Sequence, residues 1–200
     1  MFNLLPAFIP LFEQLLVDIS SALRASSIPH MIIGGQAVLV YGEPRLTRDI
    51  DITLGVDVDE LERVQKAIAA LSLSTLTEDP QSFAASTHVL PLLHEESGIR
   101  VDLIFSFSPY EQEALKRVTG RSLQGFEVPF ASLEDIIIHK LVAGRPRDIE
   151  DIRGILARNH KRDDPYVLRW LDEFGKALER PLREDYQKLL AERSNRPKAE

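Results

Sequence analysis

The sequence predicts an α/β fold: a mixed sheet flanked by helices, with a bundle of helices at the C-terminal end. Three patterns lead to this prediction. An apolar strand at residues 30–33 runs into two glycines and a short helix, residues 49–54 alternate between polar and apolar side chains, and apolar residues recur with a helical period after residue 131. The expected division is a core of residues 1–130, a helical region of residues 131–191 and a disordered tail of residues 192–200.

Composition places the chain among ordinary globular proteins. Two hundred residues, of which 44% are hydrophobic and 28% charged, are enough to bury a core. The absence of cysteine excludes disulfides, thiolate zinc sites and thiol nucleophiles, and it fits a reducing cytoplasm, which is the expected location. No apolar run reaches the length of a membrane span, and residues 1–16 lack the basic start of a signal peptide, so we expect them to lead into a core helix and expect no membrane contact.

The net charge of −7 hides an asymmetry along the chain. Residues 1–139 carry 9 basic and 19 acidic side chains, whereas residues 140–200 carry 15 basic and 12 acidic ones. The acidic first part fits a metal site. The mildly basic second part fits either a surface for a polyanion such as RNA or a solvated helix face.

Two aspartates on one predicted strand are the central motif. Because successive side chains on a strand point to opposite faces, Asp49 and Asp51 share one face with Thr53, and the intervening isoleucines share the other. Two carboxylates one strand repeat apart repel each other unless a counter-charge lies between them. Mg²⁺ prefers such oxygen ligands, together with substrate phosphates. The pattern fits either a metal site or a solvated strand face.

The chain before this strand offers a place for phosphate. Gly34 and Gly35 end the first strand and open a short helix, which presents backbone N–H groups and the positive end of a helix dipole. A tight turn without a ligand is the alternative. The loop at residues 43–48 then carries Arg45 and Arg48, which either bridge the aspartates or meet a triphosphate.

The other elements follow from periodicity and turn residues. Pro91 has no backbone N–H, so the strand that contains it is expected at an edge of the sheet. Its hairpin partner carries Asp102. The expected elements are helices at residues 11–25, 36–41 and 60–71 and from Pro109, strands at 87–94 and 99–105, a ribbon at 121–128 that bends at Gln124-Gly125, and late helices at 165–176 and 181–191.

Asp102 is the third acidic candidate. Val101 and Leu103 belong to the apolar face of its strand, so Asp102 lies on the opposite face. A third carboxylate on a neighbouring strand suits a two-metal site, because an acceptor hydroxyl must bind metal and lose a proton. The alternative is an exposed strand acid that pairs with Arg100.

Lys140 breaks the pattern of the first C-terminal helix. That helix begins after Ser132, and its apolar stripe includes Ile137 and Leu141. At about 100° per residue, Lys140 points into this stripe. Such a lysine either extends its ammonium to solvent or reaches a phosphate or carboxylate in a cleft. A local rule broken in this way is typical of a functional site.

A second C-terminal helix follows directly. Its predicted stripe consists of Ile149, Ile152 and Leu156, so Asp148 borders the buried face and Asp151 lies away from it. Asp148 is either an acid of the kind that helix N-termini favour or part of a site.

The first motif resembles that of a known superfamily. Gly34-Gly35 followed by Arg45-x-Thr47-x-Asp49-x-Asp51 is similar to the signature of the DNA polymerase β-like nucleotidyltransferases. More narrowly, it resembles the abortive-infection nucleotidyltransferases of the AbiEii/AbiGii type (type IV toxins).

A later run extends the resemblance to residues 28–155. Lys140-x4-Arg145-x-Arg147-Asp148-x-x-Asp151 resembles the downstream lysine and aspartate motifs of these proteins. The chain is shorter than the larger toxins of this type, and its acceptor-binding helical region is reduced.

The resemblance implies a minimal nucleotidyltransferase core and an enzyme that moves a nucleoside monophosphate from an NTP to an acceptor hydroxyl. It implies that Asp49 and Asp51 bind two Mg²⁺ ions, and that Asp102 binds the catalytic ion and helps to deprotonate the acceptor. Lys140 would offset charge on the triphosphate. The implied nucleotide-binding residues are Gly34, Gly35, Arg45, Thr47, Arg48, Lys140 and Asp148.

The same resemblance implies partners. The expected role is the toxin of a toxin–antitoxin pair, acting on tRNA ends or on proteins and neutralised by an antitoxin protein. One alternative is a small-molecule acceptor, as in antibiotic nucleotidyltransferases. The other is a non-catalytic nucleotide-binding or interaction protein built on the same fold.

Overall fold

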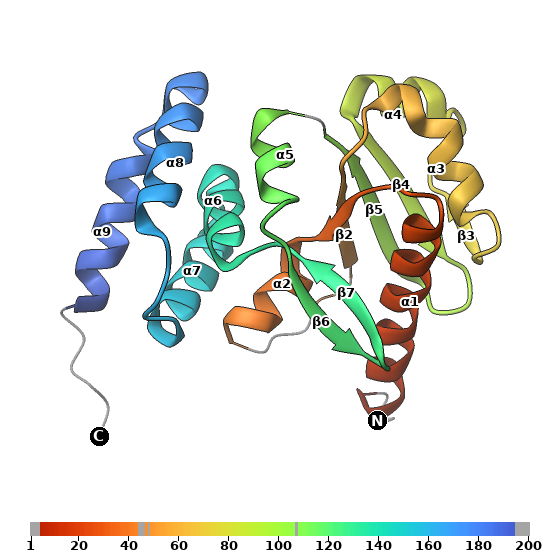
Figure 1. The fold of residues 1–200 in the computed structure, drawn as a ribbon, viewed down its shortest axis with the longest axis horizontal. Coiled ribbons are helices and arrows are strands. Elements are labelled where there is room, and N and C mark those ends of the chain that lie inside the picture. Colours follow the sequence, from red (N-terminus) through yellow and green to blue (C-terminus); the bar gives the residue numbers. More distant parts are fainter. Residues whose placement is uncertain (1–4, 44–46, 48, 107, 195–200) are drawn as a thin grey trace. The chain divides into compact units, whose positions relative to one another are not determined.

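The computed structural model describes residues 5–43, 47, 49–106 and 108–194, and the side chains of this part other than those of residues 5–10 and 194. The chain packs as two compact units. The first consists of Met1–Gln36 and Leu46–Ala131, and the second of Ala37–Arg45 and Ser132–Glu200. The predicted α/β class with a mixed sheet and a helical C-terminal part is confirmed (Figure 1).

The first unit is built on a seven-stranded sheet with the strand order β3-β4-β5-β2-β1-β7-β6. Two pairs, β2 with β5 and β1 with β7, run parallel, and the other neighbours run antiparallel. The strands are β1 (His30–Ile32), β2 (Asp49–Leu54), β3 (Leu73–Thr75), β4 (Val89–His94), β5 (Ile99–Phe105), β6 (Thr119–Leu123) and β7 (Phe126–Phe130).

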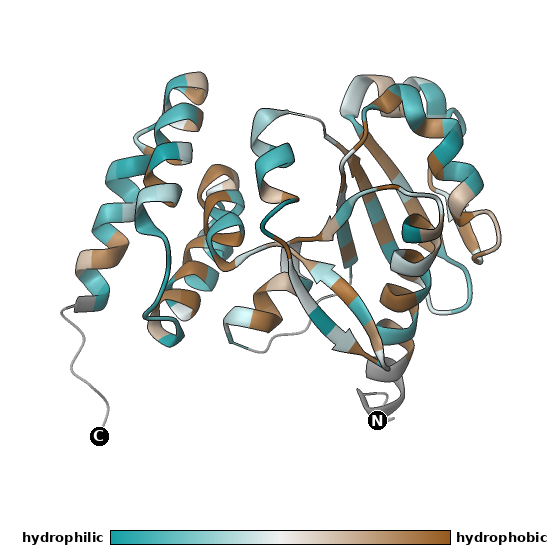
Figure 2. Ribbon diagram, in the orientation of Figure 1, coloured by the Kyte–Doolittle hydropathy of each residue, from teal (hydrophilic) through white to brown (hydrophobic). Residues whose placement is uncertain are grey.

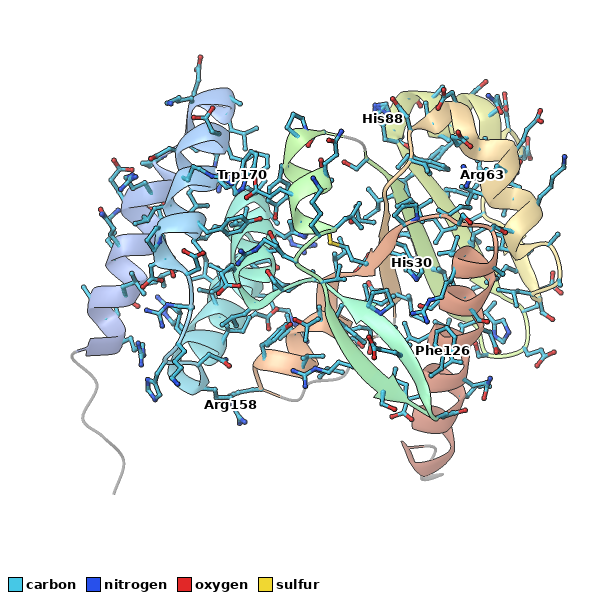
Figure 3. All side chains as sticks on the ribbon, viewed as in Figure 1. His30, Arg63, His88, Phe126, Arg158 and Trp170 are labelled. Carbon is cyan, nitrogen blue, oxygen red and sulfur yellow. The ribbon has the colours of Figure 1, made fainter. Side chains whose placement is uncertain are left out.

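The long helix α1 (Leu5–Ala25) contains the helix predicted at residues 11–25 and packs against α3 (Leu61–Ile68) and β7. Ile19 and Leu23 are fully buried in this contact layer. Arg63 of α3 donates to the carbonyl oxygens of Ser26 and Ser27 at 2.8 and 3.0 Å, which ties α3 to the end of α1 (Figure 3). The other helical segments of this unit are η1 (Val58–Glu60), α3 (Leu61–Ile68), α4 (Pro80–Thr87) and α5 (Pro109–Ala114).

The two hairpins form as expected, but the edge assignment of Pro91 was wrong. β4 lies between β5 and the short strand β3, which the sequence analysis did not predict. Leu76 donates its backbone N–H to the carbonyl of Pro91 at 2.9 Å. Pro91 has no N–H to return this bond, so the β3–β4 ladder ends here. The proline therefore limits the length of the neighbouring strand rather than marking an edge.

The second unit is helical. α6 packs against α7 and α8, and α8 packs against α9. Trp170 of α8 lies 6.3 Å from the ring of Phe174 (Figure 3). The helices are α2 (Gly34–Tyr41), which begins in the first unit, and α6 (Leu133–Ala143), α7 (Pro146–Arg158), α8 (Asp164–Leu178) and α9 (Leu182–Ser194).

The C-terminal end differs from the prediction. The last helix was expected to stop at residue 191, but α9 continues to Ser194, so residues 192–194 are helical. Residues 195–200, the rest of the predicted tail, lie outside the described part of the chain.

Hydrophobic residues gather on the strands of the sheet, while α8 and α9 are mostly hydrophilic (Figure 2). This distribution agrees with a sheet that carries the apolar core of the first unit and with helices of the second unit that expose much of their surface. Within the described residues, no helix combines the length and the apolar character that a bilayer span needs.

Candidate active site

The carboxylate face of β2 forms as the alternation predicted. Ile50 and Ile52 are fully buried, whereas Asp49 is exposed and Asp51 is half-buried. β5 runs parallel to β2 and places Asp102 directly opposite Asp51 in the register. Since partner residues of neighbouring strands point to the same face, the three carboxylates share one side of the sheet.

These carboxylates have the right chemistry for a hard cation. Neighbouring strands lie about 4.8 Å apart, so the carboxyl groups of Asp51 and Asp102 can reach a common ion. Among the described residues, however, no three acidic or histidine side chains already form a metal-binding cluster. Instead, Asp102 Oδ1 accepts a hydrogen bond from Arg100 Nε at 3.0 Å. The ion pair that was the alternative for Asp102 is therefore present.

Gly34 is pressed against this face. Its φ angle is +64°, and an added Cβ would lie 1.9 Å from Asp51 Oδ2. The neighbouring Ile33 donates its backbone N–H to the carbonyl of Asp51 at 2.9 Å, which holds the two segments together. Gly34 and Gly35 then start α2, as predicted, so the helix N-terminus begins beside the aspartates. Only glycine combines this backbone conformation with this close approach.

Thr47 is one of the predicted nucleotide-binding residues, and it is buried. Its hydroxyl accepts a hydrogen bond from the amide of Gln36, a residue of the first turn of α2. The contact ties the loop before β2 to the glycine turn. No sequence pattern had singled out Gln36. The predicted residues Arg45 and Arg48 lie outside the described residues.

In the second unit, Lys140 pairs with two carboxylates. Its ammonium lies 2.7 Å from Asp148 Oδ1 and 2.8 Å from Asp151 Oδ2, and its side chain is only 7% exposed. Of the two possibilities for Lys140, the ammonium therefore reaches carboxylates and does not extend to solvent.

The expected position of Asp151 was wrong. It is buried on the same face of α7 as Asp148, because residues three apart on a helix are neighbours. The stripe was drawn around Ile149, which is only half-buried, whereas Ile155 is fully buried and shifts the centre of the face. The i, i+3 spacing of the two aspartates is the sequence feature from which this arrangement could have been predicted.

Asp148 is enclosed by donors. Arg145 donates to it through Nε at 2.6 Å and through its backbone N–H at 3.2 Å, in addition to the bond from Lys140. Burial by itself would raise the pKa of Asp148, but the hydrogen bonds and charges of Arg145 and Lys140 outweigh it and lower the pKa below its ordinary value.

This lowered pKa predicts an acid-dependent loss of stability. As the pH falls toward the ordinary value of 3.8, Asp148 of the unfolded chain takes up a proton before Asp148 of the folded protein does. The free energy of unfolding therefore decreases as the pH is lowered, until the pH passes below the pKa of the folded state. Urea unfolding between about pH 5 and pH 3 should show a shallower pH slope for Asp148→Asn than for the parent protein. Asp185→Asn, in the exposed pair with Lys188, is the control and should keep the parent slope. Equal slopes for Asp148→Asn and the parent would contradict the assignment.

Comparison with known proteins agrees with this geometry. The family model described as "Nucleotidyl transferase AbiEii toxin, Type IV TA system" matches residues 29–199. The chain belongs to this family. The predicted resemblance is thereby confirmed, and AbiEii family membership carries the general activity of a nucleotidyltransferase. A search of curated proteins found no match.

Solved structures share the fold of this AbiEii family member. An antigenic nucleotidyltransferase-like protein from Paracoccidioides brasiliensis is 20% identical, with a TM-score of 0.51 over 72% of this chain and 73% of that one. The structure of ANT(2")-Ia in complex with adenylyl-2"-tobramycin is 16% identical, with a TM-score of 0.56 over 87% of this chain and 98% of that one. The lincomycin-bound lincosamide antibiotic adenylyltransferase LnuA is 18% identical, with a TM-score of 0.50 over 75% and 96%. At such identities the likeness shows the fold alone.

Proposed function

We propose that this protein transfers a nucleoside monophosphate from an NTP to an acceptor hydroxyl. The observation that carries the proposal is the placement of Asp51 and Asp102 at partner positions of two parallel strands, with Asp49 on the same face. The acceptor oxygen forms a bond to the α-phosphorus, the bond between that phosphorus and the bridging oxygen breaks, and pyrophosphate leaves. Membership of the AbiEii family supports this reaction class.

In this proposal the three carboxylates hold two Mg²⁺ ions. Asp49 and Asp51 would ligate both ions, while Asp102 would ligate one and take part in removing the proton of the acceptor hydroxyl. When bound, Mg²⁺ offsets the charge of the triphosphate and acidifies the hydroxyl. The backbone N–H groups at Gly34 and Gly35 would bind phosphate oxygens at the start of α2.

The remaining assignments rest on the family resemblance. By this resemblance, nucleotide phosphates would be contacted by Lys140, with Asp148 as its partner, and by the loop residues Arg45, Thr47 and Arg48. The ammonium of Lys140 has three N–H donors, of which two are directed to Asp148 and Asp151, so the third could donate to a phosphate oxygen. We further propose that residues 1–130 form the catalytic core and residues 131–191 an accessory helical region.

The proposed acceptor is RNA, such as a tRNA end, or a protein hydroxyl, and the proposed biological role is that of a toxin with an antitoxin partner. The family description supports the toxin role. The mildly basic charge of residues 140–200 agrees with RNA. A second candidate acceptor is an antibiotic-like small molecule, which the fold shared with ANT(2")-Ia and LnuA favours.

A labelling experiment tests the proposal. Purified protein with Mg²⁺ is given each α-labelled NTP in turn, with total tRNA, cell extract or an aminoglycoside and lincosamide panel as acceptor. Label in RNA, protein or antibiotic supports the reaction and names the acceptor class. Absence of both transfer and Mg²⁺-dependent NTP binding overturns it.

Asp51→Asn should lower the transfer rate by about 100-fold or more, since one group that holds metal beside the reacting phosphate is lost. Asp59→Asn removes an exposed carboxylate from η1 of the same unit and should leave the rate unchanged. Initial rates with saturating NTP measure both effects. A parent-like rate for Asp51→Asn would rule out the proposed metal site.

A further inference from the structure

Arg100 lies on the carboxylate face that the proposed function uses. In the parallel register of β2 and β5 it is the partner of Asp49, and it precedes Asp102 on its own strand by one repeat. Its Nε donates to Asp102 Oδ1 at 3.0 Å. The Arg100 side chain is 55% exposed and that of Asp102 is 19% exposed, so the guanidinium approaches the carboxylate from the solvent side.

No other basic side chain on these strands shares this position. β4, the other neighbour of β5, places Leu93 opposite Arg100 and Pro91 opposite Asp102. Within Asp49–Leu54, Val89–His94 and Ile99–Phe105, Arg100 is the one lysine or arginine. Arg100 is thus both the register partner of Asp49 and the hydrogen-bond donor of Asp102.

The carboxylate that accepts this bond is one of the proposed metal ligands. Carboxylates on partner positions repel each other unless a cation offsets their charge, and a guanidinium or a divalent ion can do so. A guanidinium at this carboxylate offsets the negative charge that would attract a divalent ion and repels the ion itself, so the two cations compete electrostatically. The Arg100 side chain is long and largely solvated, so it can leave the carboxylate without losing contact with water.

We propose that Arg100 is an internal counter-cation of the carboxylate site. It neutralises Asp102 while the site holds no metal and releases it when a divalent ion and nucleotide enter. This positioning role deepens the proposed function, since it requires that Asp49, Asp51 and Asp102 form a metal site. Its consequence is that Arg100 weakens metal binding and stabilises the metal-free protein. An ordinary surface ion pair would do neither to a measurable extent.

Mn²⁺ binding tests the proposal without any turnover. Free Mn²⁺ is measured by electron paramagnetic resonance in titrations of the parent protein, Arg100→Gln and Arg100→Lys, and the Tm of each is measured in EDTA. Arg100→Gln should bind Mn²⁺ about three- to tenfold more tightly, because it no longer competes for Asp102. It should also have a lower Tm in EDTA and a larger rise in Tm on addition of Mn²⁺. Arg100→Lys keeps the positive charge and should stay close to the parent.

Two controls separate the possible failures. Lys116→Gln removes one exposed positive charge from the same unit, so it reports the general effect of net charge and should leave the Mn²⁺ affinity unchanged. Asp51→Asn should abolish Mn²⁺ binding if the proposed site exists. Parent-like affinity and Tm in Arg100→Gln, with binding lost in Asp51→Asn, would overturn the role of Arg100 and leave the proposed function standing. Absence of Mn²⁺ binding in both the parent and Arg100→Gln would overturn both.

Discussion

Gly34→Ala should lower the free energy of unfolding by about 2–5 kcal/mol and stop nucleotidyl transfer. A non-glycine residue at φ +64° costs about 1–2 kcal/mol, because its Cβ approaches the following carbonyl oxygen. The added Cβ would also lie 1.9 Å from Asp51 Oδ2, so the carboxylate must move away from the face that it shares with Asp102. Overpacking of this kind costs a further 1–3 kcal/mol or so.

Gly98→Ala is the matched control for this substitution. Gly98 has a φ of +66°, but nothing lies within 4 Å of its added Cβ. It should therefore lose only the backbone contribution of about 1–2 kcal/mol and keep its transfer activity. Urea unfolding and the labelled-NTP assay measure the two effects. If Gly34→Ala and Gly98→Ala agree in both stability and activity, the contact between Gly34 and Asp51 has no role.

Lys140→Met should lower the free energy of unfolding by about 3–5 kcal/mol, the usual cost of removing one partner of a buried ion pair. The substitution leaves Asp148 and Asp151 buried without the ammonium that lies 2.7 and 2.8 Å from them. Asp148 keeps its bonds from Arg145. Asp151→Asn in the Lys140→Met background should recover part of the loss, because it removes one of the two buried negative charges that the ammonium offsets.

Lys188→Met provides the comparison for Lys140→Met. Lys188 pairs with Asp185 at 3.1 Å on α9, where the two side chains are 70% and 40% exposed. The same change of side chain should alter stability there by less than about 1 kcal/mol. Urea unfolding of both variants, with NTP affinity measured beside it, separates a structural role of Lys140 from a phosphate contact. A small stability loss in Lys140→Met would contradict the buried network.

Local patterns were enough for much of the fold. Ser108 and Ser132 cap the helices that begin after them, and Gly144 ends α6 with a φ of +64°. Such signals depend on hydrogen bonds within a few residues, so the sequence carries them in full. The same holds for the alternation of β2, where a period of two assigns Asp49 and Asp51 to one face.

Long-range pairing was less predictable. That Asp102 lies on the face opposite its apolar neighbours followed from alternation, but its position beside Asp51 depends on the register of two strands separated by some fifty residues of chain. Pro91 misled the prediction because the strand that pairs beyond it, β3, has only three residues and no distinct pattern. The contact of Gln36 with Thr47 likewise joins two segments that no local rule connects.

The sequence by itself determined the family, the α/β class, the face that carries the aspartates and the unusual position of Lys140. It did so because strand and helix periodicity and short motifs are local properties of the chain. Only the tertiary structure decided that Asp102 lies opposite Asp51, that Arg100 donates a hydrogen bond to Asp102, and that Asp151 joins Asp148 around Lys140. These contacts depend on strand register and on the rotation of one helix against another, and both are set by the packing of the whole core.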